Sequence, residues 1–138
     1  DGLSSVVRTT GNPDCHIVLR GGATGSNYHR DSVESAARAA AKAGLSRGVM
    51  VDCSHGNSSK DHTRQAAVFL EVVGNFAGGQ KAILGVMLES NLRPGKQAWK
   101  QGQKPEYGVS ITDACIGWDE TERLLLDAAT QLSRAAAG

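Results

Sequence analysis

Four short apolar segments, each running directly into polar side chains, constrain the fold of this chain more than any other feature. With their polar ends they cover residues 16–22, 49–55, 82–90 and 109–113. Near-continuous runs of Val, Ile and Leu are typical of strands in a parallel sheet that is covered on both faces. We therefore expect four parallel strands, each of which ends in residues with useful chemistry.

Helical patterns alternate with these segments, over residues 31–43, 59–76 and 119–136. The first begins at Asp31, a good N-cap residue, and stops before Gly44, which suits the position after a helix end. Strand–helix alternation predicts βαβ units with right-handed crossovers. The expected fold class is α/β, with residues 1–138 forming a single domain.

One connection departs from this alternation. Residues 91–107 contain four basic residues and two prolines, with scarcely any apolar period. A loop of this length in a compact domain is usually functional or mobile. We interpret its lysines Lys96, Lys100 and Lys104 as solvated surface.

Composition and charge exclude several classes of protein. The formal net charge is +1, which gives no long-range field for a nucleic acid backbone. No stretch of about 18 apolar residues is present, so we expect no membrane span. The first residues carry no basic stretch followed by an apolar run, and three scattered cysteines form no disulfide framework. A reducing cytoplasmic compartment is therefore expected.

Four residues with complementary chemistry lie at or just beyond the ends of the expected strands. They are Arg20, His55, Glu89 and Asp113, separated by 35, 34 and 24 residues. In β/α barrels the active site is built at the carboxyl ends of several strands. We therefore expect these four side chains to form one site.

The residue types indicate a metal beside a phosphate. One imidazole and two carboxylates suit Mn²⁺, Fe²⁺, Co²⁺ or Zn²⁺. Arg20 precedes two glycines and offers a planar fork that matches phosphate. This pairing suggests chemistry on a phosphorylated substrate with a polarised carbonyl.

Each of these residues also has a structural interpretation. His55 could be a hydrogen-bonded structural histidine, and Glu89 could mark the return of the chain to solvent. Asp113 could hydrogen-bond its own backbone in a turn. Arg20 could be a structural ion-pair partner. The joint pattern favours the functional interpretation.

The same segments carry a resemblance that runs through essentially the whole chain. The sequence resembles the type I 3-deoxy-D-arabino-heptulosonate 7-phosphate (DAHP) synthases in four motifs. In one-letter code these are GNPDCHIVLRGG with NY at 27–28, DCSHGNSSK at 52–60, GVMLES at 85–90 and SITDACIGW at 110–118. The departures inside the motifs are mild: Cys53 stands where the family often has Phe, and Gly56 where it often has Ala.

The resemblance implies a (β/α)₈ barrel that condenses phosphoenolpyruvate with erythrose 4-phosphate, the first step of aromatic amino acid biosynthesis. It implies that His55, Glu89 and Asp113 are three of four ligands of a divalent metal, with Mn²⁺ the first expectation. It also implies that Arg20 contacts the phosphate of phosphoenolpyruvate. His55, near the reacting carbonyl, could in addition help to move a proton.

The resemblance covers only the last four strand units of the family, so we expect the C-terminal half of a barrel. The fourth ligand, a cysteine, and a lysine–arginine cluster belong to the other half. The chain alone is therefore expected to be inactive, and its open sheet edges predict a homo-oligomer. One alternative is a non-catalytic phosphate- or metal-binding module. The other is the chemistry of the related 3-deoxy-octulosonate 8-phosphate synthase, but the motif at 111–118 favours the heptulosonate enzyme.

Overall fold

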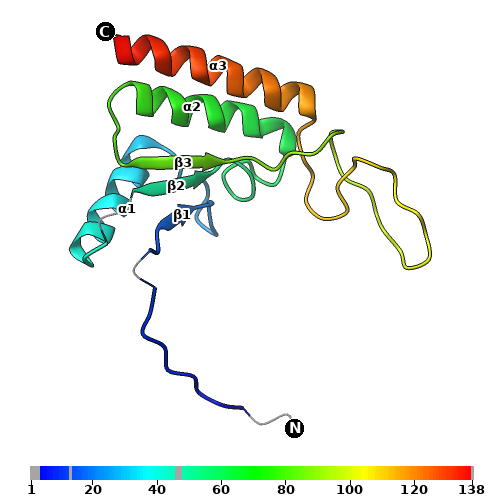
Figure 1. Cartoon of the computed structure of the whole chain (residues 1–138), viewed down its shortest axis with the longest axis horizontal. Coiled ribbons are helices and arrows are strands. Elements are labelled where there is room, and N and C mark those ends of the chain that lie inside the picture. Colours follow the sequence, from blue (N-terminus) through cyan, green and yellow to red (C-terminus); the bar gives the residue numbers. More distant parts are fainter. Residues whose placement is uncertain (1–3, 13, 46–47, 138) are drawn as a thin grey trace.

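The chain forms a βαβαβα arrangement in a computed structural model that describes residues 4–12, 14–45 and 48–137 (Figure 1). The helices and strands, in chain order, are β1 (Ile17–Leu19), α1 (Arg30–Lys42), β2 (Val49–Asp52), the 3₁₀ turn η1 (His62–Arg64), α2 (Gln65–Ala77), β3 (Ile83–Met87) and α3 (Trp118–Ala137). None of the helices in these described ranges combines the length and hydropathy needed to cross a bilayer.

The three strands form one parallel sheet in the order β1-β2-β3. Val49 of β2 pairs with Ile17 on one side and Ile83 on the other. Parallel neighbours need a crossover between them, and α1 and α2 supply the two crossovers. The expected α/β class with a parallel sheet is confirmed.

The predicted fourth strand at 109–113 is wrong. Among these residues the structure gives only an isolated bridge, between Ser110 and Lys96, and the segment lies in the connection between β3 and α3. The side chain of Gln97 donates to the carbonyl oxygen of Val109 at 2.9 Å. The segment pairs with the preceding part of its own loop rather than with β3, so the described chain holds three βα units instead of four.

The first two helices begin at different places from those predicted. Helix α1 starts one residue early, with His29 as its N-cap and Asp31 in the first turn, where a carboxylate favours the helix dipole. It ends at Lys42, one residue before the predicted end, and Gly44 follows the C-cap with φ +77°, its N–H donating to the Ala41 carbonyl. Helix α2 starts later than expected, since Ser59 and Lys60 have left-handed φ values of 57° and 61°.

The hydrophobic core lies between the sheet and the helices. Val49 and Val51 are fully buried against Val33 of α1 and Phe69 of α2. Helix α3 packs on α2 through Leu124 and Ala128 (Figure 1). No helix among the described residues covers the opposite face of the sheet, and its apolar side chains Val18, Leu84 and Met87 are 41%, 50% and 43% exposed.

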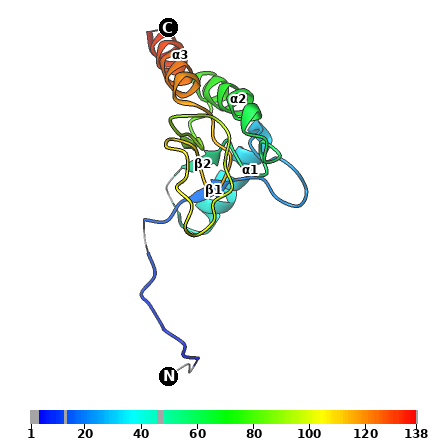
Figure 2. The same ribbon diagram turned by 90° about the vertical axis from the view of Figure 1, so that its right-hand side faces the viewer.

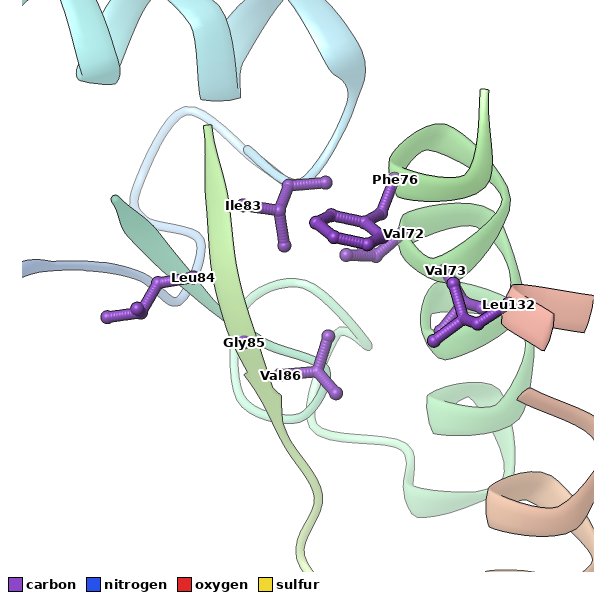
Figure 3. Close-up of a pocket in the computed structure, with 8 residues that line it drawn as sticks. All are labelled: Val72, Val73, Phe76, Ile83, Leu84, Gly85, Val86 and Leu132. Atoms are coloured by element: carbon purple, nitrogen blue, oxygen red, sulfur yellow. The ribbon is translucent and has the colours of Figure 1, made fainter. Parts of the chain in front are cut away.

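Because α3 lies against α2 and not over β3, an apolar cavity of about 200 Å³ remains between the three elements. Figure 3 shows Ile83 and Val86 pointing toward α2 and α3, whereas Leu84 points to the other side of the strand. The cavity is lined by Val72, Val73, Phe76, Ile83, Leu84, Gly85, Val86 and Leu132.

The connection between β3 and α3 is irregular, as the sequence predicts, and folds back on itself. Gly95 and Cys115 exchange backbone hydrogen bonds of 2.8 and 3.1 Å, and Arg93 donates to the carbonyl of Gly108 at 2.8 Å. Figure 1 shows this loop projecting beyond the ends of the strands, and Figure 2 views it from that end, with the N-terminal segment extending away from the sheet. The doubling of the loop returns residues near 113 to the carboxyl ends of the strands.

The three cysteines, all free, give a direct test of the packing. Burial, with a contribution from Asp52, raises the pKa of Cys53 to about 12, and burial also raises the pKa of Cys115. A thiol below its pKa stays protonated and unreactive. At pH 8, iodoacetamide should therefore label one site in the native chain, the exposed Cys15, and three after unfolding. Rapid native labelling of Cys53 by mass spectrometry would contradict this packing.

Candidate metal centre at the strand ends

Three of the four predicted site residues come together at the carboxyl ends of the strands. His55 Nε2 lies 3.5 Å from Asp113 Oδ2 and 3.9 Å from Glu89 Oε1. All three candidate ligand atoms lie within 4.8 Å of one another. Within the described residues, this is the group of His, Cys, Asp and Glu side chains close enough to share a cation.

The three residues reach this place by different routes. His55 follows β2 by three residues, and Glu89 follows β3 by two. Asp113, which the sequence predicts at a strand end, arrives instead through the doubled loop. Exposure rises in the same order, at 21%, 37% and 63% of the side chain, so the imidazole is the most enclosed of the three.

A buried carboxylate orients the imidazole. Asp52 is 4% exposed, and its Oδ2 lies 2.7 Å from His55 Nδ1. Its other oxygen accepts from the backbone N–H of Ser54 at 2.8 Å. When Nδ1 carries the proton, Nε2 presents its lone pair toward Glu89 and Asp113. Asp52 was not predicted as a site residue, although it stands three residues before His55 in the same motif.

The backbone around His55 is also fixed. His55 has φ +48°, a left-handed conformation that is uncommon outside glycine. Its carbonyl oxygen accepts from the Lys60 N–H at 2.7 Å and lies 3.4 Å from the hydroxyl of the fully buried Ser58. The turn after β2 is closed by these bonds and carries the imidazole toward the strand ends.

Arg20 lies directly after β1, but the structure does not bring its side chain into the cluster. The side chain is exposed and makes no ion pair with any described residue. Its carbonyl accepts from the N–H of the buried Asn57 at 3.3 Å, and Asn57 Nδ2 donates to the carbonyls of Leu19 and Asp52. The backbone of Arg20 is thereby held against the turn that carries His55.

Gly21 allows this close approach. Its φ is +75°, and a Cβ built there would lie 2.5 Å from the carbonyl carbon of Gly56. No side chain fits between two backbones at that distance. The contact places the segment after β1 directly on the turn after β2, so the two loops are packed together with no side chain between them.

Two lysines lie beside the cluster. A cavity of about 90 Å³ is lined by Ser54, His55, Lys60, Lys96, Asp113 and Ala114. Lys96 is exposed, as expected for solvated surface, and the doubled loop, in which Lys96 pairs with Ser110, also brings it to the edge of this cavity. No spacing in the sequence signals that approach.

Comparisons with known proteins give one consistent result. The sequence model described as the DAHP synthetase I family matches residues 2–126. The chain is 50% identical over 124 residues to the Phe-sensitive phospho-2-dehydro-3-deoxyheptonate aldolase of Escherichia coli K12, covering 90% of this chain and 35% of that protein. It is 44% identical over 135 residues to a phospho-2-dehydro-3-deoxyheptonate aldolase of Alternaria alternata, covering 96% and 36%.

A solved structure agrees with these sequences. The phospho-2-dehydro-3-deoxyheptonate aldolase from Francisella tularensis SCHU S4 matches with a TM-score of 0.81 and 39% identity, over 91% of this chain and 36% of that one. The chain thus spans about a third of the length of each of these relatives. Since the family match covers nearly all of its residues, the chain belongs to the DAHP synthetase I family.

Proposed function

We propose that this chain supplies the metal-binding part of an active site that condenses phosphoenolpyruvate with erythrose 4-phosphate to DAHP and phosphate. The observation that carries the proposal is the convergence of His55, Glu89 and Asp113 at the strand ends. Membership of the DAHP synthetase I family supports this particular reaction. The chain spans about a third of its relatives, so we propose that activity requires residues outside it.

The donor set fits a divalent cation. Metal–ligand bonds of about 2.0–2.2 Å place neighbouring ligand atoms about 3.0–3.4 Å apart, and opposite ones about 4.2 Å apart. The distances of 3.5 and 3.9 Å from His55 Nε2 fall between these two values, so small side-chain rotations bring the atoms to ligand spacing. Two carboxylates would neutralise a 2+ charge, and the mixture of one nitrogen and two oxygens suits Mn²⁺, with Fe²⁺, Co²⁺ and Zn²⁺ as the other candidates.

The residues around the cluster support a second, anionic partner. Lys60 and Lys96 line the small cavity that His55 and Asp113 also line, and neither makes an ion pair with a described residue. Arg20 adds a third cation on the neighbouring loop. We propose that Arg20 binds the phosphate of phosphoenolpyruvate, and the two lysines add positive charge beside the carboxylates.

Each residue of the candidate site then has a definable task. His55 presents Nε2 to the cation while Asp52 holds the proton on Nδ1. Glu89 and Asp113 contribute charge and oxygen ligands. A bound divalent cation would supply Lewis-acid polarisation of the aldehyde carbonyl. Asn57 and Gly21 hold the Arg20 segment against the His55 turn, which fixes the distance between the two binding functions.

The relatives favour the seven-carbon product over the alternatives. The similar proteins described above carry the name of the heptonate aldolase, which supports erythrose 4-phosphate rather than arabinose 5-phosphate as the acceptor. A non-catalytic binding module is not favoured, because the family is named for an enzyme.

The metal centre can be tested by binding alone. Glu89→Gln and Asp113→Asn should each lower the affinity for Co²⁺ by at least about 100-fold, because a ligand is lost, whereas a group that only orients a ligand costs roughly 10- to 100-fold. Isothermal titration calorimetry measures this. The control is Asp127→Asn, an exposed carboxylate on α3 paired with Arg123. Unchanged affinity in the two site variants would contradict the assignment.

The reaction can be tested by complementation. We expect phosphate release from phosphoenolpyruvate and erythrose 4-phosphate with Mn²⁺ only when this chain is mixed with the N-terminal two-thirds of the Escherichia coli relative. The matched control is the same mixture with His55→Ala in this chain. Turnover by the chain alone, or by the His55→Ala mixture, would contradict the proposal.

The uncovered face of the sheet predicts self-association. Val18, Leu84 and Met87 leave apolar surface in solvent, and β1 and β3 leave open edges. We propose that a second copy covers this face in the isolated chain, which light scattering after size exclusion would detect as a dimer or larger. Leu84→Lys should shift the population toward monomer. A folded monomer at all concentrations would contradict this prediction.

A further inference from the structure

We propose that Gln65 is a positioning residue for the candidate metal centre, acting through Glu89. The inference rests on the metal site proposed above and goes beyond its ligands. Gln65 is fully buried, at the first residue of α2, and its side-chain amide reaches across to the segment after β3. No metal-ligating role is assigned to Gln65 itself.

The contact is a matched pair of hydrogen bonds. Gln65 Nε2 donates to the Glu89 carbonyl oxygen at 3.1 Å, and the Glu89 backbone N–H donates to Gln65 Oε1 at 2.8 Å. Both ends of the amide are used on a single residue. In an antiparallel sheet a neighbouring residue would offer its own N–H and C=O in this way, and here a side-chain amide supplies both groups.

The pair occurs where the sheet has stopped. The last backbone bond from β2 toward β3 runs from Cys53 N–H to the Met87 carbonyl at 2.9 Å. Two residues later, Glu89 has no strand neighbour on that side among the residues that the structure describes. Gln65 fills the vacant place, so the Glu89 backbone keeps a defined direction when the carboxylate turns toward His55 Nε2.

The Glu89 carbonyl also binds the loop that carries the third candidate ligand, Asp113. The Glu89 carbonyl accepts a second hydrogen bond, from the Ile116 N–H at 2.9 Å, and Ser90 forms an isolated parallel bridge with Ile116. Ile116 lies three residues after Asp113. The Glu89 carbonyl oxygen therefore connects the start of α2 to the returning loop, because it accepts one hydrogen bond from Gln65 and one from Ile116.

A buried glutamine could simply stabilise the fold, and the chain offers a matched control for that role. Gln80 is 3% exposed, and its Nε2 donates to the Arg30 carbonyl at 2.8 Å. It joins the turn before β3 to the start of α1 and contacts none of the three candidate ligands through a recorded hydrogen bond. Gln80→Met therefore reports the general cost of losing a buried glutamine.

The test is a double-mutant cycle read by Co²⁺ affinity and by the visible absorption of bound Co²⁺. Methionine at 65 keeps the length of the side chain but removes both hydrogen bonds. We expect Gln65→Met to weaken Co²⁺ binding by about 10- to 100-fold, in the range for groups that orient a ligand. Gln80→Met should change it by less than about threefold. In a Glu89→Ala background, Gln65→Met should add less than about threefold, because no carboxylate remains to be misplaced.

The outcomes separate the possibilities. An unchanged affinity in Gln65→Met overturns the inference and leaves the metal centre standing. An equal loss with and without the Glu89 carboxylate also overturns it, since the effect would then be general. No Co²⁺ binding by the unaltered chain overturns the metal centre and this inference together. If circular dichroism shows Gln65→Met unfolded, Gln65→Glu keeps the acceptor for the Glu89 N–H, and a loss that again vanishes without the Glu89 carboxylate is the supporting result.

Discussion

Buried side-chain hydrogen bonds beyond the strand ends hold the candidate site together. A parallel sheet fixes its strands by backbone bonds, but between β2 and β3 these stop at Cys53 and Met87, before His55 and Glu89. Past those points Asn57 joins the ends of β1 and β2, and Gln65 joins the start of α2 to Glu89. Leaving such a buried group unpaired costs about 1–3 kcal/mol, so the polar network resists alternative loop arrangements.

The network also explains why three ligands from separate parts of the chain can meet. Asp52 sets the imidazole of His55 from within the same turn, whereas Glu89 and Asp113 depend on contacts between distant segments. The loop from residue 91 to 117 contributes no regular strand, yet its two arms bond to each other and return Asp113 to the strand ends. The conformation of this irregular loop is therefore fixed by hydrogen bonds, as the conformation of the sheet is.

The sequence pattern was sufficient for the three strands with near-continuous apolar residues and for the approximate extent of α1 and α3. It was misleading at 109–113, because alternating Val, Ser, Ile and Thr look like a strand while the pairing partner lies in the same loop. Residue type and strand position were enough to nominate His55, Glu89 and Asp113. The proximity of Gln65 and Lys96 to the site could not be predicted in this way. It depends on contacts with residues 24 and 14 positions away in the sequence, and no hydrophobic periodicity indicates such contacts.

The most direct test of the central claim is the position of a bound cation. Crystals of the chain grown with Mn²⁺, with diffraction recorded at the manganese absorption edge, should give one anomalous peak about 2.0–2.2 Å from His55 Nε2 and from carboxylate oxygens of Glu89 and Asp113. A well-ordered His55, Glu89 and Asp113 with no peak between them, or a peak held by other residues, would contradict the account.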